Sequence, residues 1–260
     1  MRYSTPGRSG RRAARPVAVL AASALAVAAL VQCSSAPPAE VETSVEAPSA
    51  APPTETSNPG VAPAPPPVQS PPAEPSAATT HPITAAELGA SWRRGCPVEL
   101  NQLRRVNLAH IDFEGRTQRG DLVLHRDLVP EVIAIFDELY RMGYPIAKMR
   151  ALDHYPDASD ELSMEDNNTS AFNCRRIPGS GSWSLHAYGR AIDINPVLNP
   201  FIDRSGAVEP TNAAPYVDRR RVDPGTLHDG GSAVRAFTQR GWKWGGHWRT
   251  PLDYQHFERQ

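Results

Sequence analysis

The chain has 260 residues, of which 40% are hydrophobic and 21% charged, and its formal net charge is −1. A domain that neutralises many phosphates normally shows a basic face, so the balanced charge argues against nucleic acid as a partner. Residues 36–80 hold 13 of the 27 prolines and almost no large apolar residues. Such a segment cannot bury a core, which leaves residues 83–260 for one globular domain of ordinary size.

The amino terminus has the pattern of an export signal. Several arginines precede residues 17–31, a run of 15 uncharged, mostly apolar residues that is short for a membrane span of about 20. The sequence Leu-Val-Gln-Cys ending at Cys33 resembles a lipobox, in which Cys33 would be lipidated. The alternatives are an ordinarily cleaved or an uncleaved leader. Every version exports the chain to the cell envelope, secreted or held at the membrane only through an N-terminal anchor.

The sequence therefore predicts three parts. Residues 1–33 form a signal peptide or lipoprotein leader, residues 34–82 a disordered Pro/Ala-rich linker, and residues 83–260 the folded domain.

Within this domain, apolar periodicity and turn residues predict the elements in chain order. The expected elements are strands at 106–113 and 121–124, a helix at 130–142, a strand at 147–152, a loop at 155–168, a loop-rich stretch at 196–224, a helix at 232–240, and short strands at 242–248 and 254–257. Helices and strands segregate rather than alternate, so α+β is the predicted fold class.

The domain contains two cysteines, Cys96 and Cys174. Because an exported domain meets oxidising surroundings, we expect a disulfide between them, worth about 3–5 kcal/mol by closing a long loop. The alternative is two free, buried thiols.

Three residues have the side chains of a catalytic zinc site. His186, Asp193 and His256 would leave one coordination position open, where a water molecule can be activated. Asp253 lies three residues before His256, in the place of a general base. Spacing alone is only moderately specific, since each His can be an ordinary surface or core residue and Asp193 can pair with Arg190.

The residues around these positions are more specific. Ser-x-His-x-x-Gly-x-Ala-x-Asp at 184–193 is followed by Trp-Gly-Gly-x-Trp at 244–248 and Asp-x-x-His-Phe at 253–257. Together they resemble the zinc D-alanyl-D-alanine carboxypeptidase family, which includes VanY-type carboxypeptidases, VanX-type dipeptidases and L-alanyl-D-glutamate endopeptidases. The resemblance is closest to a secreted bacterial branch and covers nearly all of residues 96–258.

The resemblance implies roles for several positions. His186, Asp193 and His256 match the zinc ligands, and Asp253 matches the catalytic carboxylate. An arginine before the His motif stabilises the developing oxyanion in the family; here this is Arg175, with Arg176 as the alternative. The implied fold, shared with Hedgehog signalling domains, is a small α+β domain with zinc in a groove on an antiparallel sheet.

Other polar and aromatic side chains have weaker claims. Ser184 is expected to hydrogen-bond near the site and to contact substrate; it lacks the partners of a hydrolase nucleophile. Trp244 and Trp248 are expected to form a wall for the peptide, the alternative being two core aromatics. The remaining candidates for ligands are His154, His228 and His247, all of them weak.

The predicted protein is a monomeric, exported zinc metallopeptidase. It would hydrolyse a peptidoglycan stem peptide, as a D-Ala–D-Ala carboxypeptidase or an L-Ala–D-Glu endopeptidase. The alternative is a non-catalytic, zinc-containing module that binds the cell wall.

Overall fold

The structure is a computed structural model that describes residues 77–260. The predicted leader at 1–33, its candidate lipidation site Cys33 and nearly all of the predicted linker at 34–82 lie outside the described residues. Within the described part of the chain, no helix has the length and apolar character needed to cross a bilayer.

The domain mixes short helices with small, mainly antiparallel sheets. The α-helices are α1 (Ala85–Leu88), α2 (Val129–Arg141), α3 (Asp160–Glu165) and α4 (Ser232–Thr238). The strands are β1 (Thr79–Pro82), β2 (Leu103–Ile111), β3 (Thr117–His125), β4 (Lys148–Met149), β5 (Asn168–Thr169), β6 (Ala191–Asp193), β7 (Phe201–Ile202), β8 (Val208–Glu209), β9 (Lys243–Trp244), β10 (Leu252–Asp253) and β11 (His256–Glu258). This content agrees with the predicted α+β class.

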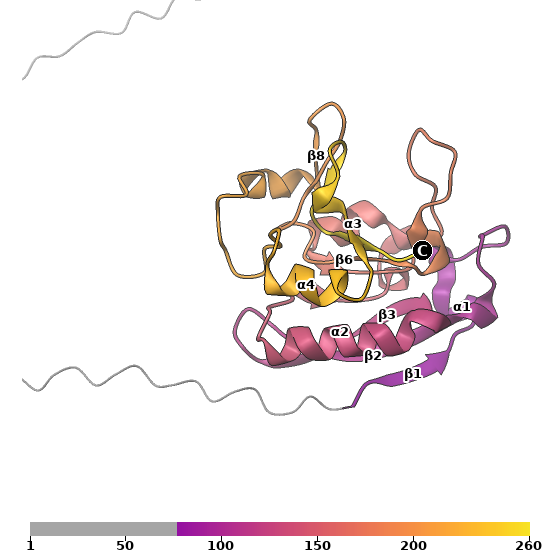
Figure 1. The fold of residues 1–260 in the computed structure, drawn as a ribbon. Coiled ribbons are helices and arrows are strands. Elements are labelled where there is room, and N and C mark those ends of the chain that lie inside the picture. The colour runs from indigo at the N-terminus through magenta and orange to yellow at the C-terminus, as the bar shows by residue number, and fades with distance from the viewer. Residues whose placement is uncertain (1–76) are drawn as a thin grey trace, which may run out of the picture. The chain divides into compact units, whose positions relative to one another are not determined.

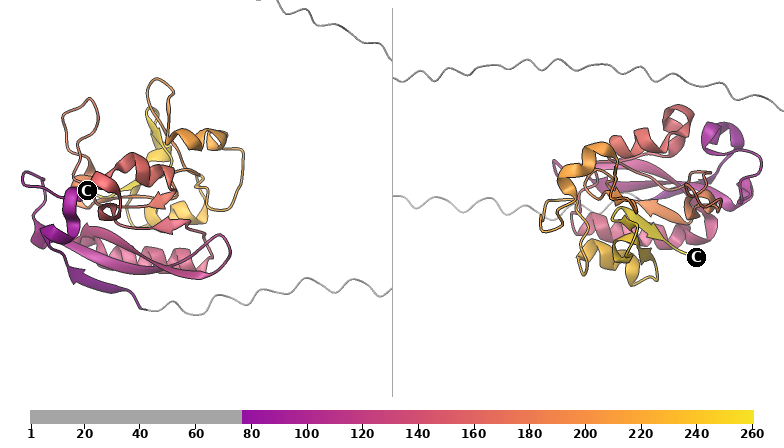
Figure 2. Two further views of the ribbon diagram at one scale, coloured as in Figure 1. Left: turned by 180° about the vertical axis from the view of Figure 1, so that it is seen from behind. Right: turned by 90° about the horizontal axis from the view of Figure 1, so that it is seen from above.

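A long hairpin forms one side of the domain. β2 and β3 pair antiparallel along their whole length, and β1, just before the predicted domain start at residue 83, adds a strand to the edge of β2. Helix α2 lies along the hairpin, and the view from behind shows the two strands in front of it (Figures 1 and 2). Pro130 at its first turn favours the start of α2, and apolar residues at helical spacing face the core.

Two further three-stranded sheets carry the candidate site. Their strand orders are β6-β11-β9 and β10-β7-β8. The core joins the first of them to the helices. Phe237 of α4 lies between Phe136 of α2, at 6.5 Å between ring centroids, and Phe257 of β11, at 3.9 Å. Close packing of these rings fixes the position of β11, which bears one of the candidate ligands.

One predicted element was wrong and several are shorter than expected; the helix expected at 232–240 ends at Thr238, and the strand expected at 254–257 begins only at His256. The predicted loop at 155–168 contains α3, whose first turn is capped by the Ser159 hydroxyl accepting from the amide of Leu162. The predicted strand at 147–152 reduces to β4, and the one at 242–248 reduces to β9 followed by a 3₁₀ turn. In both cases only two residues find a partner strand.

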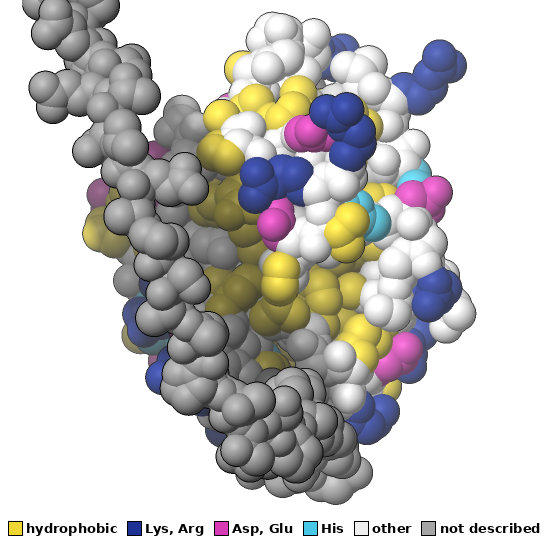
Figure 3. All heavy atoms as spheres, turned by 90° about the vertical axis from the view of Figure 1, so that its left-hand side faces the viewer, with side chains coloured by type: hydrophobic (Ala, Val, Ile, Leu, Met, Phe, Trp, Pro, Cys, Tyr) yellow, Lys and Arg dark blue, Asp and Glu magenta, His cyan; other side chains and the backbone are white. Residues whose placement is uncertain are grey.

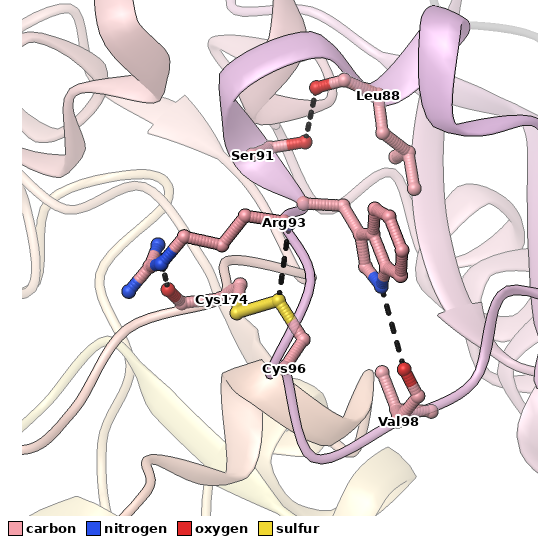
Figure 4. Close-up of a disulfide and its surroundings, with 7 residues drawn as sticks. Leu88, Ser91, Arg93, Cys96, Val98 and Cys174 are labelled. Atoms are coloured by element: carbon pink, nitrogen blue, oxygen red, sulfur yellow. Dashed lines mark hydrogen bonds between the residues drawn. A yellow bond between two sulfur atoms is a disulfide. The ribbon is translucent and has the colours of Figure 1, made fainter.

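A disulfide joins Cys96 to Cys174, with 5.8 Å between the Cα atoms (Figure 4). The same contact is reinforced by hydrogen bonds. The Arg93 guanidinium donates to the carbonyl of Cys174 at 2.8 Å, and the amide of Cys174 donates to the carbonyl of Ser91 at 3.1 Å. The N-terminal turns thus hold the chain immediately before Arg175.

Charged side chains are mixed on the face seen in Figure 3. Lys or Arg side chains lie beside Asp or Glu side chains there, with apolar side chains between them. Neither sign gathers into a patch on the part of this face that the described residues form.

Buried His110 in β2 makes the free energy of unfolding depend on pH. Its side chain is 4% exposed, and its Nδ1 has no hydrogen-bond partner. Burial lowers the pKa of His110 to about 4, and the nearby charge of Asp112 offsets only part of this effect.

We expect the free energy of unfolding to fall as the pH drops from about 6.5 to about 4. In that window the unfolded chain binds the proton and the folded chain does not, so acidification favours unfolding by on the order of 2–3 kcal/mol. Urea unfolding of wild type and His110→Asn at several pH values measures this. Equal pH dependence in the two proteins between pH 5 and 6.5, where few carboxylates titrate, would contradict it.

Candidate metal centre

The candidate centre begins with the pairing of β6 and β11. Asp193 and His256 are direct partners in this antiparallel ladder, so their side chains leave the sheet on the same face. The His256 Nδ1 lies 3.0 Å from the Asp193 Oδ1. The amide of Asp193 also donates to the carbonyl of Ser170 at 2.9 Å, which ties β6 on its other side.

His186 comes from the turn that precedes β6. A short 3₁₀ helix, Leu185–Tyr188, is capped by the Ser184 hydroxyl, which accepts from the amide of His186 at 3.2 Å. Gly189 ends the turn with φ +67°, a left-handed conformation that glycine adopts easily. The Gly189 carbonyl accepts from the amide of His125 at 2.8 Å, so the turn is fixed to the end of β3.

These elements bring three donor side chains together. The His186 Nε2 lies 3.1 Å from both the Asp193 Oδ2 and the His256 Nδ1. All three residues are buried, and they form the group among the described residues that could hold a metal ion.

The outer nitrogen of each imidazole has its own partner. The His186 Nδ1 faces the carbonyl of Ala171, and the His256 Nε2 lies 3.5 Å from the Glu258 Oε2. Such outer contacts commonly orient metal-binding histidines. Glu258 was missed in the sequence, although a residue two positions after His256 in a strand shares its face.

The donor set fits zinc. Two imidazoles and one carboxylate, without thiolate, are ligands of catalytic zinc sites with one open position. Tetrahedral zinc with bonds of about 2.0–2.1 Å holds its ligand atoms roughly 3.3 Å apart. The two imidazole nitrogens here are 3.1 Å apart, and each lies 3.0–3.1 Å from a different oxygen of the Asp193 carboxylate. With one ligand atom taken from each residue, the three atoms lie within 4.8 Å of one another.

The electrostatics of the cluster favour a bound cation. Burial would raise the pKa of Asp193, but the two imidazoles beside it lower the pKa well below the usual value. Burial would likewise lower the pKa of His256, but its hydrogen bonds to Asp193 and Glu258 raise that pKa to about 10. Without metal, a proton supplies the positive charge that a zinc ion would provide.

The cluster opens into a groove of about 470 Å³. Asp253, predicted as the base, lines it from β10. Its Oδ1 is buried without a hydrogen-bond partner, and burial raises the pKa of Asp253 to about 7, helped by the charge of Asp193 and opposed by His256 and Arg175. A carboxyl group with such a pKa can both accept and release a proton near neutral pH.

Arg175 lines the same groove, and its Nε lies 2.9 Å from the Asp160 Oδ2. The alternative, Arg176, lies outside it, with its guanidinium 4.1 Å from the ring centroid of Trp183. The structure therefore brings Arg175, and not Arg176, to the cluster's groove.

Of the three residues predicted to contact substrate, two line the groove and one does not. Ser184 and Trp248 line the groove, and the Trp248 ring lies 5.4 Å from that of His256. Trp244 does not line it, because its side chain is 3% exposed and packs in the core. The Trp244 indole N–H donates to the carbonyl of Tyr254, between Asp253 and His256 in the chain.

The three weaker histidines lie outside the cluster. His154 lines a separate cavity along β3 and β4, His228 has the Thr226 hydroxyl 2.9 Å from its Nε2, and exposed His247 pairs with Asp229 at 2.8 Å.

Comparison with known families agrees with this geometry. Residues 178–259 match the family model of D-alanyl-D-alanine carboxypeptidase. The matched segment contains the three clustered residues and Asp253, and it begins three residues after Arg175. Over residues 178–259 the match agrees with the family resemblance that the motifs indicated, and it supports a peptidase of the carboxypeptidase type. No curated protein and no solved structure matches the chain.

We expect Gly189→Ala to destabilise the fold more than Gly230→Ala. Both glycines have nearly the same φ, +67° and +68°. A Cβ at Gly189 would lie 2.6 Å from the His125 nitrogen, whereas a Cβ at Gly230 meets nothing within 4 Å. The left-handed conformation should cost each variant roughly 1 kcal/mol, and the clash should add about 1–3 kcal/mol to Gly189→Ala alone. Thermal unfolding of both variants measures the difference; equal losses would show that the turn does not dock as described.

We expect His186→Ala to lose zinc, because two remaining side chains cannot hold the ion tightly. The measurement is the zinc content of the purified full chain after dialysis, together with the rise in melting temperature on adding zinc. The control is His154→Ala, which removes an imidazole outside the cluster and should retain one zinc per chain. Zinc retention by His186→Ala at the wild-type level would exclude this centre.

Proposed function

We propose that this chain, whose residues 178–259 match the family model of D-alanyl-D-alanine carboxypeptidase, is an exported zinc peptidase of the cell wall. It would hydrolyse an amide bond of the peptidoglycan stem peptide, at D-Ala–D-Ala or at L-Ala–D-Glu. The observation that carries the proposal is one groove lined by the His186, Asp193 and His256 cluster, by Asp253 and by Arg175.

Each group has a chemical task. Zinc, held by the three clustered residues, would supply a Lewis acid that polarises the scissile carbonyl and makes water a better nucleophile. The Asp253 carboxylate takes a proton from the attacking water and returns it to the leaving amine nitrogen. The Arg175 guanidinium supplies positive charge for the developing oxyanion.

Asp160 supports Arg175 in this task. Its Oδ2 lies 2.9 Å from the Arg175 Nε, and its Oδ1 accepts from the side-chain Nδ2 of Asn173 at 3.3 Å. A guanidinium held on one side by Asp160 and by its covalently fixed neighbour Cys174 is preorganised, so little reorganisation accompanies the reaction.

The export signal predicted from the sequence of residues 1–33 and the proline-rich composition of residues 34–82 support a place in the envelope. An extended linker at about 3.1 Å per residue would let some 45 residues reach on the order of 100 Å from a membrane. A domain on such a tether could act within a wall layer as a monomer.

The bond that is cut can be identified directly. The full chain is incubated with defined muropeptides, with and without a chelator, and the products are read by mass spectrometry. Release of a single terminal alanine that stops with chelator identifies a zinc carboxypeptidase, and a cut after L-Ala identifies an endopeptidase. A folded, zinc-loaded chain that cuts neither bond would refute the proposed activity and favour a binding module.

We expect Asp253→Asn to lower kcat by about 10²–10⁴-fold with unchanged zinc content, because the amide cannot shuttle the proton. In the wild type, kcat should rise with pH as Asp253 loses its proton. Burial raises the pKa of Asp253 to about 7, and a bound dication lowers it again, so we expect the midpoint between about pH 4 and 7.

Steady-state kinetics from pH 4 to 9 test this expectation. Asp253→Glu is the conservative control and should recover part of the activity, since it keeps the carboxylate. Near-wild-type turnover by Asp253→Asn would rule out Asp253 as the base.

A further inference from the structure

The groove extends away from the metal cluster along one row of side chains. In the sheet β10-β7-β8, Asp253 lies directly opposite Phe201, and Phe201 lies directly opposite Glu209. Direct partners in antiparallel ladders project from the same face, and all three residues line the groove. Adjacent strands are about 4.8 Å apart, so Glu209 stands roughly 10 Å from Asp253, with the Phe201 ring between them.

The far end of this row is acidic. Glu161 of α3 lines the groove together with Glu209 of β8. Both α3 and β8 lie on the side of the domain away from β1 (Figures 1 and 2). Among the described residues, neither carboxylate has an ion pair with Lys, Arg or His within 4.0 Å. Arg175, the one Lys or Arg in the described lining, is already paired with Asp160.

The charges near Glu161 reinforce one another. Partial burial raises the pKa of Glu161, and the negative charges of Glu165, Glu209 and Asp160 raise it further. Among the described residues, no cation is a cause that opposes this rise. The acidic end is therefore a negative region that a cation from outside the chain would stabilise.

A second observation points to a ligand here. Gln255 is 3% exposed and lines the groove, and its Oε1 has no hydrogen-bond partner. Its side chain also hydrogen-bonds to that of Asp253, and its Nε2 lies 3.6 Å from the sulfur of Met164, one helical turn after Glu161 in α3. Gln255 therefore lies between Asp253 and the acidic end. A buried carbonyl oxygen without a donor is costly, so this wall of the groove is suited to a ligand that donates hydrogen bonds.

We infer that the acidic end of the groove, Glu161 and Glu209 with Gln255 in its wall, binds an ammonium group of the substrate. An ammonium group offers three donors and no acceptor, which matches two carboxylates and an unpartnered carbonyl. The apolar Phe201 ring suits the methylene groups or backbone that lead to it. This inference rests on the proposed function, because it takes the scissile bond to lie beside Asp253.

The distance restricts where the ammonium group sits in the peptide. An extended chain covers about 3.3–3.6 Å per residue, so roughly 10 Å corresponds to about three residues, or to one residue plus a long side chain. Two sources meet this condition: a free amino terminus near the cut, and the side-chain amine of a diamino acid. Both sources present a primary ammonium group, and the acidic end of the groove is suited to bind that group.

The test measures binding apart from cleavage. The full chain carrying Asp253→Asn is loaded with zinc, and peptide affinity is measured by titration calorimetry. The probes are the stem pentapeptide L-Ala-D-Glu-L-Lys-D-Ala-D-Ala, the same peptide acetylated at its amino terminus, and the same peptide acetylated at its lysine side chain. We expect one of the two acetylations to weaken binding roughly tenfold or more, and that acetylation identifies the source.

Variants of the acidic end provide the second arm. Glu209→Gln and Glu161→Gln should each weaken binding of the free-amine peptide severalfold and reduce the discrimination against the acetylated one. Glu209→Asp keeps the negative charge, so it should recover much of the affinity for the free-amine peptide and of the discrimination against the acetylated one. Glu114→Gln is the control: Glu114 is exposed in the turn between β2 and β3, does not line the groove and is not among the charges that act on Glu161, so its change should be below about twofold. Zinc content and melting temperature verify that each variant folds.

Three results would overturn the inference: no probe binds, neither acetylation weakens binding, or Glu209→Gln behaves like Glu114→Gln. Failure of the proposed function is a different result, in which wild type cuts no muropeptide while binding still depends on the amine and on Glu209.

Discussion

The candidate centre depends on the antiparallel register of β6 and β11, in which Asp193 faces His256 across the ladder. This register places a buried carboxylate against an imidazole at 3.0 Å, and the turn held by Gly189 adds His186 at 3.1 Å. A buried charge without a partner would cost several kcal/mol, so neither side chain could remain there alone. The backbone ladder and the cluster therefore stabilise one another, and the site is preformed by the fold.

Two other parts of the chain converge on this centre. The sheet β10-β7-β8 contributes Asp253, whose burial raises its pKa towards neutrality. The segment fixed by Cys174 contributes Arg175, with Asp160 on its other side. The base and the cation are thus held by elements other than those that hold the donors. Each group has the environment that its chemistry needs: low polarity for Asp253, and a fixed counter-charge for Arg175.

The sequence predicted the long elements and the motif residues, because both leave local patterns. Apolar spacing identified α2, and the motifs identified His186, Asp193 and His256 with Asp253. Helix α3 was missed because a short acidic segment lacks an amphipathic stripe; Ser159 at its start was the available signal. The burial of Trp244 and the groove position of Trp248, four residues apart, depend on tertiary packing that no local pattern encodes.

The contacts between two-residue strands could not be predicted at all. β7 and β8 lie in the stretch expected to be loop-rich, and their register alone places Glu209 in a row with Asp253. The donors and this row lie on different sheets, joined in the chain through Tyr254 and Gln255. Evolution can therefore exchange the side chain at the outer strand, or lengthen that strand, while the chemistry stays intact. Substrate selectivity and turnover can therefore change independently, because substitutions in the outer strand alter the first without altering the residues that carry out the second.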